Sequence, residues 1–341
     1  MTLLVTGARG FVMSNLLRTW LVKHPDERAV VVDTGEADAS IRDFLGNAME
    51  RVTWLLHDVR DTATWGEAAR EAGVDRIAHG AALTPHAWTD DAGIRHDRER
   101  DEPEVILDVN LGGTLAVLGF ARALPVCRRF LLVSTGSVYG NEGPDGPLPE
   151  DGYVAPVGLY GISKFAAEMV VRRFGQLHGL PVVAGRLASV YGPMDRVLPS
   201  RHVVCKPNAM TELALAGEPL LLNSAEPVGD YISVTDVAEA LCLLVDAEQT
   251  DHFAYNVALG EAVGLGALAE MVCGLVPGSE WRVDAESANL TGDPTKLRGQ
   301  WGAYDISRLT REFGWKPRPL TEGLKEYVQW RRDRRAAGLP I

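Results

Sequence analysis

The sequence predicts an α/β protein with a doubly wound parallel sheet and a smaller C-terminal α/β domain. Through the first half of the chain, short apolar segments alternate with amphipathic ones, which is the order of strands and helices in a parallel sheet. After residue 186 the segments become shorter and turns more frequent. We therefore expect a first domain at residues 1–185, to which segments near 230–257 return, and a second, substrate-binding domain at residues 186–341.

The composition is that of a folded protein with an acidic charge balance. Of the 341 residues, 46% are hydrophobic and 23% are charged, which is ordinary for a globular protein. The net charge of −12 disfavours a nucleic-acid or anionic-membrane partner, because binding to phosphates needs a basic surface. No apolar run approaches the length of a membrane span. The scattered cysteines and histidines predict reduced thiols, no metal site and a cytoplasmic location.

The first predicted strand, Leu3 to Val5, runs into a glycine turn and then into a helical pattern. Gly7 permits the tight turn, and Gly10 lets backbone amides approach a pyrophosphate at the positive end of the helix. Met13 stands at the usual third glycine position, where we expect it to disturb the packing of helix on strand. Arg9, Phe11 and Val12 lie in the same turn and are further candidate contacts of the cofactor.

The second predicted strand, residues 29–32, ends at Asp33. An acid at this position can accept hydrogen bonds from both hydroxyls of the adenine ribose and repels a 2′-phosphate. Arg9 could hold such a phosphate, but Asp33 opposes it. The sequence therefore predicts NAD rather than NADP as the cofactor.

Three more strands are expected at residues 52–56, 76–78 and 130–133, with helices near 41–49, 62–72 and 103–124 between them. Ligands of doubly wound sheets bind at the carboxyl ends of the strands. The residues at those ends are Gly7, Asp33, Asp58, Ala81 and Thr135. This convergence predicts a dinucleotide site along one edge of the sheet.

Tyr160 and Lys164 are four residues apart at the start of a predicted helix, 158–178, so both project from one face. An ammonium at that distance favours the phenolate and would lower the pKa of Tyr160 toward neutrality. A tyrosine so tuned can move a proton to or from a hydroxyl or carbonyl oxygen. Taken alone, the pair is also compatible with an ordinary exposed i, i+4 pair.

The chain resembles the extended short-chain dehydrogenase/reductase family, in particular its NAD-dependent epimerase/dehydratase branch. The resemblance rests on motifs in the family's order along nearly the whole chain. These are TGARGF at 6–11, Asp33, HDVRD at 57–61, HGAA at 79–82, VNLGGT at 109–114, STGSVYG at 134–140, YGISK at 160–164, RLASVYGP at 186–193, DYISVTDVAEAL at 230–241 and DISRLTREFGW at 305–315. The resemblance implies a Rossmann-type fold that binds NAD.

By this resemblance, Tyr160 is the catalytic acid/base, Lys164 binds the nicotinamide ribose, and Thr135 hydrogen-bonds the reacting hydroxyl. The implied cofactor contacts are Gly7, Arg9, Gly10, Phe11, Val12, Asp33, Asp58, Val59, Ala81, Ala82, Asn110, Tyr160 and Lys164. Among these, Asp58 and Val59 match the adenine-contacting pair, and Asn110 matches an asparagine that braces the site. The resemblance also implies a homodimer formed by helices near 103–124 and 158–178.

For the reaction, the sequence favours an NAD-dependent dehydrogenase that acts on a secondary hydroxyl of a sugar or sugar acid. The alternative is a nucleotide-sugar 4-epimerase with tightly held NAD, although Gly229 stands where such members carry a diphosphate-gripping arginine. A dehydratase is disfavoured, because Gly136 and Ser137 replace the Asp and Glu that follow the threonine in hexose dehydratases. An alternative from another class of protein is a non-catalytic NAD-binding sensor or scaffold. The intact Thr135, Tyr160 and Lys164 argue against it.

Candidate substrate contacts lie around the expected cofactor crevice. They are Thr84, His86, Thr135, Ser137, Ser189, Arg196, Arg201 and Arg298. The arginines are candidates for a carboxylate or phosphate of the substrate. Residues 84–104 form a strongly charged insertion, which is either a solvated surface loop or a lid over the substrate.

Overall fold

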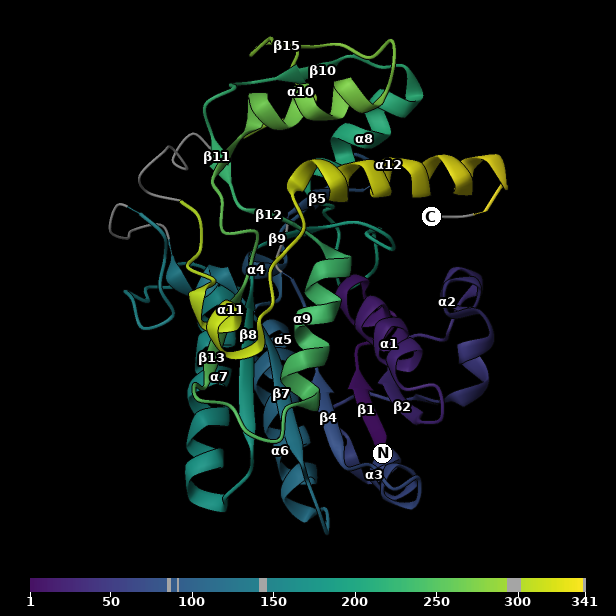
Figure 1. Ribbon diagram of the computed structural model, residues 1–341, viewed down its shortest axis with the longest axis vertical. Coiled ribbons are helices and arrows are strands. Elements are labelled where there is room, and N and C mark those ends of the chain that lie inside the picture. Colours follow the sequence, from purple (N-terminus) through teal and green to yellow (C-terminus); the bar gives the residue numbers. More distant parts are fainter. Residues whose placement is uncertain (85–86, 91, 141–145, 293–301, 340–341) are drawn as a thin grey trace.

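The computed structural model describes residues 1–84, 87–90, 92–140, 146–292 and 302–339. Its centre is a parallel sheet of seven strands, which confirms the predicted fold class (Figure 1). In spatial order the strands are β13 (Ala254–Val257), β8 (Val182–Leu187), β7 (Arg129–Thr135), β4 (Arg76–His79), β1 (Thr2–Thr6), β2 (Arg28–Asp33) and β3 (Val52–Leu56). The order reverses between β1 and β4, so the carboxyl ends of these two strands flank a crevice.

Helices cover both faces of the sheet. One face is covered by α1 (Phe11–Lys23), α2 (Ala39–Leu45) and α9 (Val234–Asp246), and the other by α3 (Thr62–Glu71), α6 (Gly113–Ala123) and α7 (Leu159–His178). Along β1, Leu3 and Val5 pack into the core beneath α1 and α9, whereas Leu4 packs into the core on the opposite face. A strand buried on both faces is apolar at every position, which explains the run that predicted β1.

The sheet draws on two separate parts of the chain. Its last strand, β13, pairs with β8 and comes from the 230–257 segment that we expected to return to the sheet. The helix α9 precedes it, and the Ser233 hydroxyl caps this helix by accepting a hydrogen bond from the Thr235 amide (3.3 Å). The division of the chain at residue 186 stays a prediction.

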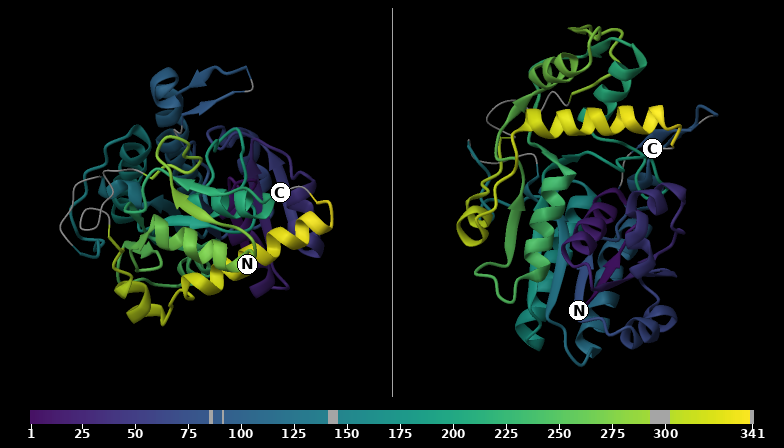
Figure 2. Two further views of the ribbon diagram at one scale, coloured as in Figure 1. Left: turned by 90° about the horizontal axis from the view of Figure 1, so that it is seen from above. Right: turned by 45° about the vertical axis from the view of Figure 1, so that its right-hand side comes forward.

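A smaller region lies beyond the carboxyl ends of the sheet strands (Figures 1 and 2). It contains α8 (Lys206–Ala216), α10 (Leu265–Leu275), α12 (Leu320–Ala336), the pair β10 (Leu220–Leu222) and β15 (Trp281–Val283), and the pair β11 (Val228–Gly229) and β14 (Val263–Gly264). At its junction with the sheet, β9 (Ser189–Tyr191) pairs with β12 (Tyr231–Ser233). Other short helices are η1 (Gly46–Arg51), η3 (Gly136–Tyr139) and α11 (Ser307–Phe313).

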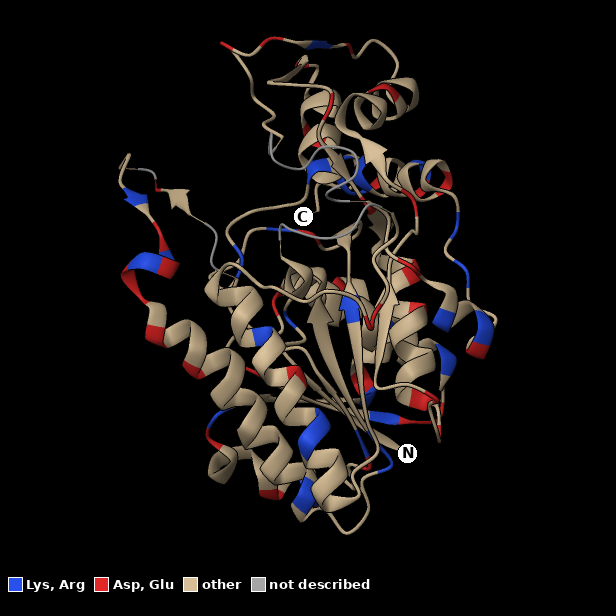
Figure 3. Ribbon diagram, turned by 90° about the vertical axis from the view of Figure 1, so that its left-hand side faces the viewer, with Lys and Arg blue, Asp and Glu red and all other residues tan. Residues whose placement is uncertain are grey.

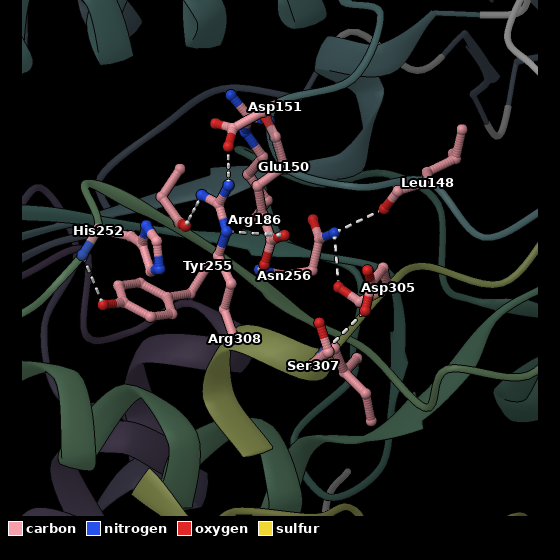
Figure 4. A network of polar contacts seen from close by, with 12 residues as sticks. Leu148, Glu150, Asp151, Arg186, His252, Tyr255, Asn256, Asp305, Ser307 and Arg308 are labelled. Atoms are coloured by element: carbon pink, nitrogen blue, oxygen red, sulfur yellow. Dashed lines mark hydrogen bonds and ion pairs between the residues drawn. The ribbon is translucent and has the colours of Figure 1, made fainter. Parts of the chain in front are cut away.

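A buried polar network links the edge of the sheet to the loops that carry Leu148 and Asp305 (Figure 4). The Arg186 guanidinium pairs with the buried carboxylate of Glu168 at 2.7 Å. The Asn256 side-chain amide donates to the Leu148 and Asp305 carbonyls, at 2.8 and 3.0 Å. The network thus joins α7, β8 and β13 of the sheet region to the segment that leads into α11.

Among the described residues, one helical segment, Pro103–Ala123, is long and apolar enough to cross a membrane by length and composition. The expectation that no apolar run approaches this length is therefore wrong. The segment comprises α5 (Pro103–Leu107), the π-helical η2 (Asp108–Gly112) and α6, and it packs against α7 (Figure 3). Only 44% of its most apolar window is buried, but a packed helix of a soluble protein satisfies the same criteria.

Candidate active site

A cavity of about 830 Å³ lies between the carboxyl edge of the sheet and the smaller region. Its floor is formed by the glycine turn after β1 and by the ends of β2, β3, β4 and β7. The opposite wall is formed by parts of residues 187–190, 198–206 and 227–231. The cavity therefore occupies the position in which a doubly wound sheet binds its ligand.

The glycine turn is shaped for a close approach of backbone to ligand. Gly7 has a φ of +77°, and a Cβ there would lie 2.8 Å from the Ala81 Cα, so only glycine fits. Gly10 begins α1 without a side-chain cap from the described residues, and Phe11 and Val12 follow it along the cavity wall. The amides of this first turn can therefore bind a pyrophosphate.

Asp33 and Asp58 also line the cavity, and Asp33 lies beside the glycine turn. The Asp33 carboxylate accepts hydrogen bonds from the Arg9 and Gly35 amides, each at 2.9 Å, and burial raises its pKa. Asp58 pairs with the Arg60 guanidinium at 2.7 Å, and that hydrogen bond lowers the pKa of Asp58. With Val59, Ala81 and Ala82 also lining the cavity, these positions fit the adenosine half of a dinucleotide.

Asn110 was predicted to contact the cofactor, but the structure places it elsewhere. It is buried and lies outside the part of the cavity wall that the structure describes. Its side-chain amide donates to the Leu83 carbonyl (3.1 Å) and the Ser163 hydroxyl (3.0 Å), and its Oδ1 accepts from the Leu83 amide (2.8 Å). Because all three bonds are internal, Asn110 joins the loop after β4 to α7 and braces the site from behind.

Thr135, Tyr160 and Lys164 all line the cavity. Burial lowers the pKa of Lys164 to about 8, and nearby Glu168 opposes this shift. Burial also raises the pKa of Tyr160, against opposing effects of the Thr135 side chain and the Arg201 charge. The expectation that Lys164 brings the pKa of Tyr160 toward neutrality is therefore not met: desolvation outweighs the neighbouring charges.

Four of the predicted substrate contacts beyond Thr135 line the cavity: Thr84, Ser137, Ser189 and Arg201. The Thr84 hydroxyl is already engaged, because it donates to the Ser200 carbonyl at 3.0 Å. The Arg201 guanidinium pairs with the buried Asp195 at 2.9 Å and lies over the Phe11 ring at 5.5 Å from its centroid.

Arg196 was predicted as a substrate contact, but it lies outside the described cavity wall. Its guanidinium forms a two-pronged pair with Asp38, at 3.1 and 2.8 Å, and Asp38 also caps α2. This charged partner draws Arg196 away from the cavity. The predicted contacts His86 and Arg298 lie outside the described residues.

Sequence reasoning missed several cavity residues, notably Tyr304, Ser200 and Lys206. Tyr304 is buried against Gly136, where a Cβ would lie 2.1 Å from the Tyr304 hydroxyl. Asp230 holds this segment by accepting the Tyr304 amide at 3.2 Å, and burial raises the pKa of Asp230 to about 6. Asp230 is the first residue of the motif at 230–241, so the sequence marks it. No sequence pattern links Asp230 to Tyr304, and Tyr304 could therefore not be predicted.

Metal-ligating side chains do not gather anywhere in the part of the chain that the structure describes. His79, the last residue of β4, is buried between the hydroxyls of Thr6 (2.8 Å) and Thr114 (3.0 Å). Burial lowers the pKa of His79 to about 3, so the ring is neutral at physiological pH. It serves the packing of β1, β4 and α6.

The model of the NAD-dependent epimerase/dehydratase family matches residues 3–258. The chain belongs to this family. Its members use NAD, and the glycine turn, the uncapped start of α1 and Asp33 fit that cofactor. NAD is therefore the cofactor of this protein, and the residues of the cavity floor would hold it.

Several relatives of this chain are named as dehydratases or epimerases of nucleotide sugars. A dTDP-glucose 4,6-dehydratase of Xanthomonas campestris is 32% identical over 96% of this chain and 92% of its own. A trifunctional UDP-glucose 4,6-dehydratase/epimerase/reductase of Arabidopsis thaliana is 26% identical over 96% of this chain and 46% of its own, so the chain spans about half of it. The solved UDP-glucose 4-epimerase of Thermus thermophilus with NAD is 26% identical, with a TM-score of 0.76 over 97% of this chain and 99% of that one.

Proposed function

We propose that this protein is a nucleotide-sugar 4-epimerase that keeps NAD bound. The observation that carries the proposal is the extent of the cavity. Beyond Tyr160 it continues into the smaller region, where Pro227, Val228, Leu265 and Gly292 line it. A free sugar would leave this part of the wall without a contact, whereas a nucleotide sugar could fill it. The named relatives also support a nucleotide sugar over the free sugar that the sequence favoured.

The catalytic residues suit proton exchange with a secondary hydroxyl. Tyr160 carries the hydroxyl that can exchange a proton with the substrate: burial raises its pKa, and the Thr135 side chain and the Arg201 charge oppose that rise. Lys164 has a pKa of about 8 and is therefore mostly an ammonium at neutral pH, where it can bind ribose hydroxyls. When bound, NAD supplies the acceptor for a hydride from the carbon that bears the hydroxyl. The net result that we propose is inversion at that carbon.

The wall near Thr135 supports epimerisation over loss of water. Elimination needs an acid and a base beyond the one that serves oxidation. Among the described residues that line the cavity, the acidic ones are Asp33, Asp58 and Asp230, and none of them follows Thr135. A carboxylate at residue 136 would displace Tyr304, which packs on Gly136. A 4,6-dehydratase is nevertheless the second candidate, because a relative of that name shares 32% identity over nearly the whole chain.

A substrate panel separates the candidates. We expect UDP- or dTDP-hexoses to yield the 4-epimer, resolved by NMR, without net formation of NADH. A 4-keto-6-deoxy sugar would instead establish the dehydratase. Stoichiometric NADH from a free sugar or sugar acid would establish the dehydrogenase. Tyr160→Phe serves as the control, since any product that persists in it does not arise at this site.

A further inference from the structure

The described residues of the charged insertion at 84–104 are folded and contact the rest of the protein. It forms a hairpin of β5 (Trp88–Thr89) and β6 (Arg95–His96), which projects from the body of the molecule, followed by the short helix α4 (Arg98–Asp101) (Figure 2). The Trp88 ring stacks on His202, with centroids 3.7 Å apart and planes 7° apart. Because His202 adjoins the cavity residues 198–201, the hairpin is fixed to the loop that carries Arg201.

Helix α4 makes contacts with two parts of the site. The Arg98 guanidinium donates to the Pro199 carbonyl at 3.0 Å. On the other side, the Glu99 carboxylate accepts a hydrogen bond from the Leu159 amide at 2.8 Å, at the first residue of α7. A Cβ at Gly158 would lie 3.2 Å from the second Glu99 oxygen, so the carboxylate sits directly at the helix start.

The start of α7 lacks a cap of its own. Its N-cap residue is Gly158, which has no side chain to accept a hydrogen bond from the first turn. Glu99 supplies that acceptor from the insertion, and its charge suits the positive end of a long helix. The residue that follows Leu159 is Tyr160, so the acid/base of the proposed reaction lies in the turn that Glu99 holds.

We propose that Glu99 is a positioning residue for Tyr160: by capping α7 from the insertion, it fixes the phenol relative to Thr135 and the reacting hydroxyl. The expected effect of Glu99 on turnover rests on the proposed function, because that function assigns the proton transfer to Tyr160. The expected effect of Glu99 on the stability of the first turn of α7 does not depend on the proposed function. In this proposal the insertion connects α7 to the cavity loop 198–202. This role differs from both a solvated surface loop and a lid over the substrate.

Hydrogen exchange in the NAD-bound protein tests the structural consequence. Glu99→Ala should speed amide exchange at residues 159–163 about 10-fold, because loss of a helix cap costs roughly one power of ten in local opening. Glu99→Gln keeps an acceptor oxygen and should stay close to the wild type. Glu104→Ala is the matched control, because Glu104 is an exposed acid of the same insertion with no hydrogen bond to its side chain from the described residues.

Kinetics on the nucleotide sugar identified by the panel test the second consequence. Glu99→Ala should lower kcat about 10-fold with KM and NADH affinity unchanged, since a displaced catalytic group slows the chemical step. Glu99→Gln should restore kcat to within about twofold. Unchanged exchange at 159–163 in Glu99→Ala, or an equal change in Glu104→Ala, would overturn the inference. A panel without any product would refute the proposed function alone, because the exchange measurement needs no substrate.

Discussion

The thioether of Met13 fills the space that a side chain at residue 80 would need. A Cβ on Gly80 would lie 2.3 Å from the Met13 sulfur and 2.5 Å from its Cγ. Met13 is in the first turn of α1, and Gly80 follows β4, so the pair packs helix against strand end beside the cofactor cavity. The expected disturbance by Met13 does not arise, because the glycine that follows β4 leaves room for the methionine side chain.

This fit predicts coupling between the two positions. Gly80→Ala should destabilise the protein by about 1–3 kcal/mol, because the added methyl group overpacks a closed site. Met13→Ala should cost about 2–5 kcal/mol through the cavity it leaves. In the double variant the methyl at residue 80 enters that cavity, so its cost should be well below the sum of the two. Urea unfolding measures all three, and strictly additive values would show that the residues do not compete for space.

The sequence predicted what depends on local pattern, and missed what depends on partners far along the chain. The strands, the glycine turn, Asp33 and the Tyr160 and Lys164 pair follow from periodicity and motif, and the structure brings these residues to one cavity. Arg196 was misplaced because its partner, Asp38, lies 158 residues away. Likewise, the pKa of Tyr160 depends on its burial in the folded protein, which no spacing of residues reveals.

Asp33 should set the preference for NAD over NADP. Its carboxylate is held by the Arg9 and Gly35 amides at the adenosine end of the cavity, where it would repel a 2′-phosphate. Asp33→Ala should weaken NADH binding and relax the preference without reversing it, because the Arg9 side chain is engaged by Asp38 (3.4 Å). Calorimetric titration with NADH and NADPH measures both effects. Wild-type binding of NADPH as tight as that of NADH would contradict the assignment.

Tyr160→Phe removes the proton carrier but keeps the ring. NADH binding should persist, while turnover falls by roughly two to four orders of magnitude. Thr135→Val is a useful companion, since it removes the hydroxyl that favours the Tyr160 phenolate and should raise the pKa seen in the pH profile of kcat. Near-wild-type turnover in Tyr160→Phe would show that another group carries the proton.

Lys164 should lower stability in exchange for function. Its pKa falls from 10.5 to about 8 on folding. Between these two values the unfolded chain binds more protons than the folded one, so this residue makes stability rise with pH across that window. Below pH 8 the buried ammonium lowers the free energy of unfolding by its full amount, about 3 kcal/mol for a shift of this size.

Lys164→Met should therefore be more stable than the wild type at pH 7, although inactive, and its advantage should shrink as pH rises above 8. Urea unfolding at a series of pH values gives the comparison. A substitution at the exposed Lys325, for which no such burial exists, is the control and should change stability little at any pH. An advantage of Lys164→Met that does not vary with pH would mean that packing, not charge, is responsible.

We expect the homodimer to form through the outer face of α5, α6 and α7. These helices pack side by side and expose Val105 (41%), Leu115 (42%), Ile162 (40%) and Met169 (38%) to solvent. A second copy that covered this face would bury the exposed part of each side chain, which is about two fifths of it, with a gain of roughly 0.6–1.2 kcal/mol for each one.

Leu115→Glu with Met169→Glu should therefore convert the dimer to a monomer, because association would bury two unpaired carboxylates. Light scattering after size-exclusion chromatography gives the mass of each form. Val22→Glu is the matched control, since Val22 is 68% exposed on α1, which covers the opposite face of the sheet. A wild-type monomer would refute the expected dimer outright. A double variant that stays dimeric would place the interface on another surface.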